Sequence, residues 1–460
     1  MPEQKRTVIT PVTRRSFPNR AMRDLSRGAI LCSAILASAI GLNACTSVGA
    51  HAASPSVDAE SRKSSVELRL PRSGSVSDFE DRVQTALSDK VAPGLVFVVM
   101  DEDRVVFSKG YGYADIERRI PATPDTIFPL GSISKTFIGT AAAIAHHDQD
   151  IDLEAPISDY LSFVIDDPRS EAHISWLHLA THTSGIIDHD PAYEDAYAIG
   201  SDVHPLSLSD FLRAYLAEGG SSYDASANFS GHAPGAAYNY SNIASGLAAL
   251  ALGDGTGIPF EDYSRETIFM PLGMDSTVWF LPQADRARVG TLYERDDEGF
   301  SAYPPYALAT WPDGGLRTTA RDLSRYLLAF MNSGTVDGKR VFDKGAVDLA
   351  LGGLDMSEVD DVPDKDVSNG LFWGMSKAPN ALQARPLVGH NGVDPGIWTL
   401  MQFDPVTERG VIAIANADMD SRETMVAFYS LAYRLFLTDF PETAATPELS
   451  PAPHQIGRRR

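Results

Sequence analysis

Cysteine is nearly absent from this chain, and this limits how the fold can be held together. The 460 residues include two cysteines, Cys32 and Cys45, and Cys32 falls in an N-terminal segment that we expect to be removed. A mature chain with one cysteine has no internal disulfide, although its compartment would permit one. Metal sites built from several thiolates are excluded as well. The fold must therefore rest on a hydrophobic core, which a chain of this length can build.

Basic residues are scarce relative to acidic ones. The chain has 39 lysines and arginines against 61 aspartates and glutamates, which gives a formal net charge of −22. Residues 1–45 carry far more basic than acidic residues, so a mature chain would be more acidic still. Such a surface argues against nucleic acid as a partner and against electrostatic binding to anionic lipid.

Two common signatures of hydrolytic sites are missing. The chain contains no H-E-x-x-H motif and no serine in a G-x-S-x-G context, which argues against a zinc protease and against a hydrolase with a nucleophile elbow. Residues 148–152 resemble the start of a calcium loop, but Leu153 stands where such a loop needs glycine, so a solvated turn is favoured. We expect neither a metal nor a cofactor.

The N-terminus resembles a bacterial lipoprotein signal. A basic lead precedes an apolar run over residues 28–42, which ends shortly before Cys45. This run is short for a transmembrane anchor, which needs about 20 residues. We therefore expect lipidation at Cys45 and an exported cell-envelope lipoprotein, facing the periplasm or the cell surface and held to a membrane by its lipid. A start at Met22 and a twin-arginine signal at residues 13–17 are open alternatives.

Composition divides the chain into four expected segments. They are a signal peptide over 1–45, a flexible tether over 46–74, a folded domain over 75–440 and a disordered tail over 441–460.

The folded domain is expected to be α/β. Apolar periodicity predicts two terminal helices and four strands: 77–89 and 421–437, and 95–100, 104–110, 398–403 and 410–415. Strands near both ends with a long helical middle favour one antiparallel sheet, built from the first and last segments and flanked by the terminal helices, plus a helical lobe. Thr319 begins a capping box before a helix of that middle region. A cleft is expected where sheet and lobe meet.

The spacing of Ser132 and Lys135 is the first chemical signal. On the first turn of a helix, positions i and i+3 share a face, so the amine would lie beside the hydroxyl. A serine hydroxyl is a weak nucleophile until a base takes its proton, and a lysine can serve or assist that base when burial lowers its pKa. The helix start also offers free N–H groups to an oxyanion. The S-x-x-K spacing alone is common, so it needs partners elsewhere.

Two further motifs supply those partners. Residues 234–242 read PGAAYNYSN and lead into an apolar helix, and residues 389–396 read GHNGVDPG just before a strand. The order S-x-x-K, Y-x-N, H-x-G resembles the serine β-lactamase and penicillin-binding protein superfamily. The resemblance is strongest to class C β-lactamases, D-alanyl-D-alanine carboxypeptidases, D-aminopeptidases and family VIII esterases. Flanking segments such as 179–185 and 314–320 extend it over nearly the whole folded domain.

This resemblance implies a role for each motif residue. Ser132 would form an acyl-enzyme, with Tyr240 and Lys135 acting together as the base for acylation. Tyr240 would then help to activate the deacylating water. Asn242 would bind the substrate amide and steady Lys135.

The third motif is implied to bind the substrate. The backbone N–H groups of Ser132 and Val393 would form the oxyanion hole. His390 would face the leaving group or a substrate carboxylate, and Gly392 would let the strand approach the substrate closely.

Other residues compete for these roles. Ser134 has no lysine at i+3, and the context of His182 is more typical of a structural turn than of a triad base. Tyr238 is expected to pack or to line the pocket. Trp311 and Trp373 could wall the cleft or belong to the core.

One departure from the family affects the expected substrate. Most β-lactamases of the family carry lysine where this chain has His390, and histidine is largely neutral at pH 7. We therefore expect a serine hydrolase of D-alanyl peptides, such as peptidoglycan peptides, or of small esters or amides. The alternatives are a true β-lactamase and a catalytically silent penicillin-binding or scaffolding lipoprotein.

Overall fold

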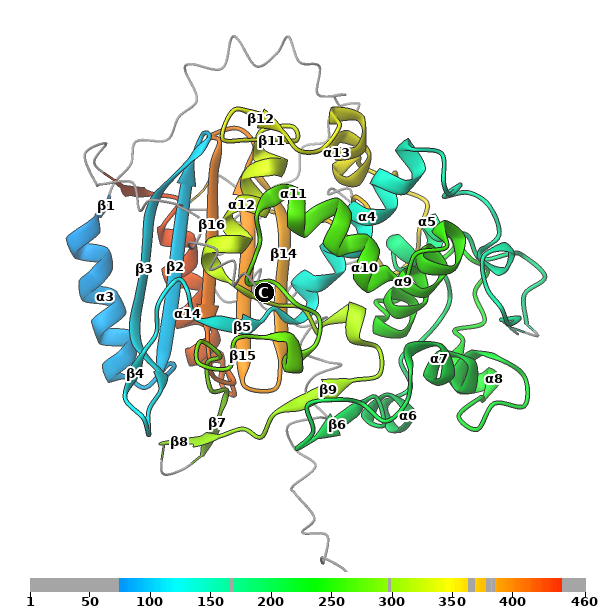
Figure 1. Ribbon diagram of the computed structural model, residues 1–460, viewed down its shortest axis with the longest axis horizontal. Coiled ribbons are helices and arrows are strands. Elements are labelled where there is room, and N and C mark those ends of the chain that lie inside the picture. The colour runs from blue at the N-terminus through cyan, green and yellow to red at the C-terminus, as the bar shows by residue number, and fades with distance from the viewer. Residues whose placement is uncertain are drawn as a thin grey trace, which may run out of the picture.

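The computed structural model describes residues 74–165, 167, 169–296, 299–362, 369–377, 382 and 385–440. The expected signal peptide, Cys45, the tether up to residue 73 and the tail over 441–460 lie outside these residues. The expected α/β class is confirmed, with one large antiparallel sheet and a helical lobe beside it (Figure 1).

The main sheet has seven strands, all paired antiparallel, and the two ends of the domain meet inside it. The strand order is β13 (Gly374–Lys377), β14 (Pro386–Asp394), β15 (Ile397–Asp404), β16 (Arg409–Ala415), β2 (Gly94–Asp101), β3 (Arg104–Asp115) and β4 (Ile120–Pro121). Strand β2 pairs with β16 along its whole length, from Leu95 opposite Ala415 to Asp101 opposite Arg409. The expectation that the first and last segments share one sheet is therefore confirmed.

Both faces of this sheet are buried. Side chains alternate along each strand, so each strand contributes to a core on either face. On β2, Leu95, Phe97 and Val99 belong to the core beneath the terminal helices α3 (Val76–Ser88) and α14 (Arg422–Arg434). Their neighbours, of which Val98 is typical, belong to the core shared with the helical lobe. The predicted terminal helices are thus confirmed to within three residues at each end.

Helix α12 (Ala320–Met331) crosses the other face of the sheet (Figure 1). The hydroxyl of Thr319 accepts the N–H of Asp322 and so caps this helix, as its sequence predicts. The Asp322 carboxylate accepts from Ser276 and Thr277 instead of completing the predicted capping box.

The helical lobe is built around α4 (Ser134–His147) and α9 (Asn242–Thr256), which contact each other. Both are apolar on nearly every side, as expected of helices buried in the middle of a lobe. The other helices and turns are α5 (Trp176–Ala180), α6 (Asp190–Glu194), α7 (Leu208–Leu216), α8 (Ala225–Asn228), α10 (Phe260–Ser264), α11 (Met270–Leu272), α13 (Lys344–Leu351), η3 (Gly131–Ile133), η4 (Ile157–Asp159), η5 (Arg265–Phe269), η6 (Leu281–Gln283) and η7 (Trp311–Asp313).

Five short strand pairs complete the fold. They are β1 (Gly74–Ser75) with β17 (Thr438–Asp439), β5 (Ile127–Pro129) with β10 (Arg317–Thr319), β6 (Tyr197–Ile199) with β9 (Tyr306–Leu308), β7 (Tyr293–Asp296) with β8 (Gly299–Ala302), and β11 (Thr335–Val336) with β12 (Lys339–Arg340). In the described part of the chain, no single helix has the length and apolarity to cross a membrane, and only the bent pair Asn242–Thr256 and Phe260–Leu272 passes that test jointly.

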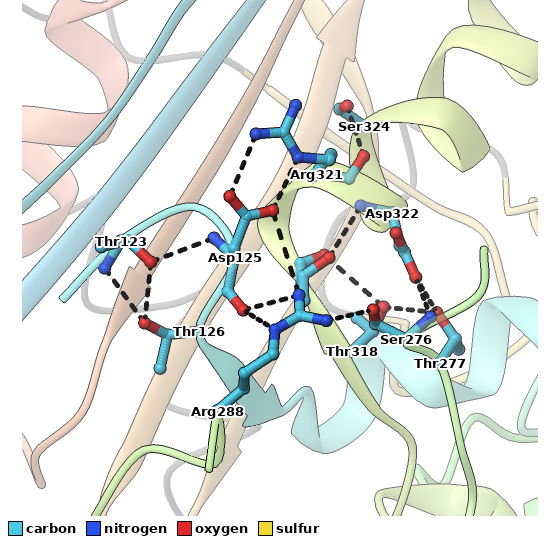
Figure 2. A network of polar contacts seen from close by, with 11 residues as sticks. Thr123, Asp125, Thr126, Ser276, Thr277, Arg288, Thr318, Arg321, Asp322 and Ser324 are labelled. Atoms are coloured by element: carbon cyan, nitrogen blue, oxygen red, sulfur yellow. Dashed lines mark hydrogen bonds and ion pairs between the residues drawn. The ribbon is translucent and has the colours of Figure 1, made fainter. Parts of the chain in front are cut away.

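A polar network holds the β5–β10 pair, which leads directly into the Ser132 turn (Figure 2). The Arg321 guanidinium donates to both carboxylate oxygens of Asp125, at 2.6 and 3.0 Å. Arg288 donates to the Asp125 carbonyl oxygen and to the Ser276 hydroxyl. The start of β5 is thereby attached to the start of α12.

Candidate active site

The candidate nucleophile Ser132 lies in a short 3₁₀ turn, η3, rather than in the first turn of the helix. This turn runs straight into α4, which carries Lys135. The Lys135 ammonium donates to Ser132 Oγ at 3.0 Å and to the carbonyl oxygen of Asp313 at 2.8 Å. Ser132 is half-buried, whereas Lys135 is fully buried. The Lys135 amine and the Ser132 hydroxyl are therefore in direct contact, and the hydroxyl remains partly exposed.

Ser134 differs from Ser132 in its surroundings. Its side chain is fully buried, and its oxygen accepts the backbone N–H of Leu316 at 3.2 Å. This geometry holds the segment after η7 against α4 and leaves Ser134 no access to a substrate.

Tyr240 reaches the same place from the loop before α9. Lys135 Nζ lies 5.1 Å from the centroid of the Tyr240 ring. The Tyr240 hydroxyl is buried and has no hydrogen-bond partner among the described residues. A phenol beside an ammonium can act as a base once it is ionised, because the positive charge stabilises the phenolate.

His182 supports Tyr240 from behind. Its ring lies 4.2 Å from the Tyr240 ring, tilted by 33°, and its Nδ1 accepts the N–H of Ser241 at 3.2 Å. Burial, helped by the charge of Lys135, lowers the pKa of His182 well below its usual value, so the ring is neutral at pH 7. Tyr238 packs edge-on against the same histidine. The contacts of His182 with the Tyr240 ring and with the N–H of Ser241 thus hold Tyr240 in position.

Asn242 is the first residue of α9, and an aspartate that the sequence analysis missed anchors this helix start. Asp188 accepts the Ser241 hydroxyl at 2.7 Å and the N–H groups of Asn242 and Ile243 at 2.8 and 3.1 Å. Burial raises the pKa of Asp188, while these donors oppose the rise. A carboxylate at the positive end of a helix stabilises that helix and fixes the loop that carries Tyr240.

Gly392 and Val393 lie against the Ser132 turn. A Cβ on Gly392 would stand 1.9 Å from the carbonyl oxygen of Leu130, and one on Gly131, whose φ is +55°, would stand 2.9 Å from Val393 N. The Thr399 hydroxyl donates to the Leu130 carbonyl oxygen at 2.7 Å. The backbone of β14 therefore touches the turn, which brings the amides of Ser132 and Val393 onto neighbouring segments.

His390 lies on β14 two residues before Gly392, on the same face of the strand. Its Nδ1 makes a short hydrogen bond to the carbonyl oxygen of Asn391. Because a carbonyl oxygen can only accept, Nδ1 carries the proton and Nε2 is left as an acceptor. Burial, with a contribution from the charge of Lys135, lowers the pKa of His390 to about 4. The ring is therefore neutral at pH 7 and supplies no fixed cation.

Two further buried carboxylates border the site. Asp313 accepts the Tyr193 hydroxyl at 3.3 Å and Asp394 accepts the Tyr197 hydroxyl at 2.8 Å. Burial raises the pKa of Asp313 to about 7 and that of Asp394 to about 6. Neither carboxylate was singled out from the sequence, although Asp394 lies inside the motif over 389–396 and Asp313 directly precedes the segment 314–320.

Residues 79–433 match the family model described as Beta-lactamase. The chain belongs to the β-lactamase family. It is therefore a β-lactamase-related serine hydrolase in the general sense, and enzymes of this kind act on small-molecule or peptide substrates.

Individual relatives of this β-lactamase-family protein are distant. It is 24% identical to a β-lactamase of Yersinia enterocolitica, over 78% of this chain and 92% of that protein. It is 30% identical to a D-aminopeptidase of Gluconobacter oxydans, over 44% of this chain and 36% of that protein. A penicillin-binding protein homologue from Pyrococcus abyssi has the same fold, with a TM-score of 0.63, 23% identity and coverage of 77% and 76% of the two chains.

The two tryptophans left open by the sequence differ in role. Trp373 is buried in the core against Phe330 and Tyr326. Trp311 is partly exposed and lines a cavity of about 370 Å³ together with Trp279 and Phe280. Residues 148–152 form the turn after α4, and no group of metal-ligating side chains occurs among the described residues.

Proposed function

We propose that this protein hydrolyses D-alanyl peptides, small esters or amides through an acyl-enzyme on Ser132. The observation that carries the proposal is the 3.0 Å hydrogen bond between the buried Lys135 ammonium and the half-buried Ser132 hydroxyl. Lys135 also lies near the ring of Tyr240, whose hydroxyl has no partner among the described residues. A nucleophile in direct contact with its activating group is the arrangement that covalent catalysis needs.

In the proposed mechanism, Ser132 Oγ bonds to the substrate carbonyl carbon while its proton passes to the Tyr240–Lys135 pair. The amides of Ser132 and Val393 stabilise the oxyanion, each worth roughly 3 kcal/mol in other hydrolases. The leaving group takes the proton and departs. Water then attacks the ester, Tyr240 accepts its proton, and Ser132 recovers a proton as the acid leaves.

The neutral His390 supports the choice of substrate. With a pKa of about 4, the imidazole offers Nε2 as a hydrogen-bond acceptor and no positive charge at pH 7. An acceptor can receive the N–H of an amide substrate, whereas it cannot pair with a carboxylate. True β-lactamase activity is the second candidate, and the Yersinia enterocolitica β-lactamase, covered over 92% of its length, favours it.

A substrate panel tests the proposal. Purified protein is assayed with nitrocefin, p-nitrophenyl butyrate, a D-alanyl-D-alanine peptide and a D-amino acid amide, alongside Ser132→Ala. We expect turnover of the ester or of a D-alanyl substrate, and loss of both turnover and fluorophosphonate labelling in Ser132→Ala. Ser226→Ala, which removes an exposed hydroxyl of α8, serves as the control. Turnover retained in Ser132→Ala would exclude the acyl-enzyme.

We also propose that Cys45 is lipidated and holds the protein to a cell-envelope membrane. The apolar run ending shortly before this cysteine supports the proposal. Expression in a bacterium fed an alkyne fatty acid should label the wild type and leave Cys45→Ala unlabelled and in the soluble fraction. Equal labelling of both would contradict the assignment.

A further inference from the structure

Two buried carboxylates, Asp313 and Asp394, lie beside the Ser132 turn and take no part in the mechanism above. Both side chains are almost fully buried, at 2% and 3% exposure. Asp313 ends η7, and its own carbonyl oxygen accepts from Lys135. Asp394 ends β14, directly after the proposed oxyanion donor Val393. The carboxylates come from different elements that converge on the nucleophile.

The register of β14 places Asp394 on one side of the nucleophile and His390 on the other. His390, Gly392 and Asp394 are alternate residues, so they share the face on which the Ser132 turn rests, and same-face neighbours are about 7 Å apart. A Cβ on Gly314 would lie 3.7 Å from Asp394 Oδ2 and 3.8 Å from the carbonyl carbon of Gly131. The Asp394 carboxylate therefore borders the turn, on the side away from His390.

The Asp394 carboxylate is incompletely satisfied. Its Oδ1 accepts the Tyr197 hydroxyl, but Oδ2 has no hydrogen-bond partner in the described part of the chain. The Tyr306 hydroxyl also has no hydrogen-bond partner among the described residues, but it lies near enough to the carboxylate to oppose the rise in the pKa of Asp394. A buried carboxylate oxygen without a donor is costly unless a ligand supplies one.

The cations nearby are occupied elsewhere. Lys135 donates to Ser132 and to the Asp313 carbonyl oxygen. Arg317 donates to the carbonyl oxygens of Gly315 and Tyr306. Its charge lowers the pKa of Asp394, but no hydrogen bond or ion pair joins the two side chains among the described residues.

The other titratable groups facing the pair supply no positive charge. They are the carboxylate of Asp188 and the phenols of Tyr193, Tyr197 and Tyr306, while the imidazoles of His182 and His390, beyond Lys135, are neutral at pH 7. Burial raises the pKa of Asp313 to about 7 and that of Asp394 to about 6, and a positive charge placed beside these two carboxyls would favour their ionised forms.

We propose that Asp313 and Asp394 form a subsite for a protonated amine on the acyl part of the substrate. The hydrolase would then prefer acyl donors with a free α-amine and disfavour acyl groups that carry a carboxylate. The inference rests on the proposed function, because it assumes that Ser132 accepts the acyl group and that His390 faces the leaving group.

A matched set of p-nitroanilides tests the subsite. D-alanine, N-acetyl-D-alanine and N-succinyl-D-alanine p-nitroanilides share one leaving group and carry a cationic, a neutral and an anionic acyl part. We expect wild-type kcat/KM to follow that order. Asp394→Asn and Asp313→Asn should lower kcat/KM for the cationic substrate by about 10- to 100-fold, as loss of a hydrogen bond to a charged group does. The neutral substrate should change by less than threefold.

The control and a direct binding measurement keep the outcomes distinct. Asp262→Asn removes the same charge from an exposed residue of α10 and should leave the order of the three substrates unchanged. In Ser132→Ala, D-alanine amide should raise the melting temperature, and N-acetyl-D-alanine amide should not. This binding test does not depend on turnover or on the folding of the aspartate variants.

Three results would overturn the subsite while leaving the hydrolase intact: equal or reversed preference in the wild type, equal losses for all three substrates in the aspartate variants, or equal stabilisation by both amides. No turnover of any substrate together with an unlabelled Ser132 would instead refute the proposed function.

Discussion

Replacing Gly392 by alanine should disable the site by displacing the nucleophile turn. The new Cβ would stand 1.9 Å from the carbonyl oxygen of Leu130, and contacts under 3.0 Å essentially never occur. The turn or the strand must therefore move by about 1 Å, and a displacement of that size can cost roughly 100-fold in rate. Overpacking at such a site also costs about 1–3 kcal/mol of stability.

Two measurements separate the effect of Gly392→Ala on the Ser132 turn from its effect on stability. Initial rates of ester hydrolysis and of fluorophosphonate labelling report the turn, and urea unfolding reports stability. Gly374→Ala, in β13 of the same sheet, is the matched control, because its Cβ would meet its nearest atom at 3.3 Å. We expect the control to remain within threefold of the wild type. A Gly392→Ala protein with wild-type labelling rates would refute the idea that close contact with β14 sets the position of Ser132.

Three further predictions concern buried charges. Asp188→Ala should lower kcat at least tenfold and destabilise the fold by about 2 kcal/mol, because three donors at the start of α9 lose their acceptor; Ser207→Ala, which uncaps α7, should cost stability alone. Arg409→Met should cost about 3 kcal/mol in urea unfolding without changing kcat of the folded protein, since it leaves the partly buried Asp101 without its bidentate partner. Asp394→Asn should stabilise the protein by about 1–3 kcal/mol at pH 8, because burial raises the pKa of this carboxyl from 3.8 to about 6 and its ionised form is disfavoured in the fold. That gain should shrink as the pH falls from 6 towards 4, where both the folded and unfolded wild type become protonated, and a gain independent of pH would contradict the argument.

Local signals in the sequence were sufficient for β2, β3, β15 and β16 of the sheet and for its terminal helices, but not for β4, β13 and β14. Apolar alternation over residues 95–100 and 410–415 predicts strands that the structure contains, and their pairing follows from the position of these strands at the two ends of the domain. The cap at Thr319 is equally local. The position of Ser132 was less predictable: the residue lies in a 3₁₀ turn before α4, because the turn must also fit against β14 at Gly392.

The carboxylates Asp188 and Asp394 could not be predicted as site residues from single sequence motifs. Asp188 caps a helix that begins more than fifty residues later, and Asp394 meets Tyr197 across an even longer stretch of chain. Such partners share no periodicity or spacing in the sequence, so only the folded arrangement brings them together. The residues of the S-x-x-K, Y-x-N and H-x-G motifs could be identified because each motif places fixed residue types close together in the sequence.

Because β2 pairs with β16, the sheet that carries β14 cannot form until the end of the domain has been synthesised. Ser132 and Lys135 lie in the first third of the chain, whereas the strand that fixes their turn, β14, and the strand that completes the sheet's middle, β16, are translated some 250 residues later. Long-range strand pairing of this kind forms slowly. We therefore expect a chain cut short before β14 to carry the Ser132–Lys135 pair without the strand that contacts its turn, and to show no labelling of Ser132 by a fluorophosphonate.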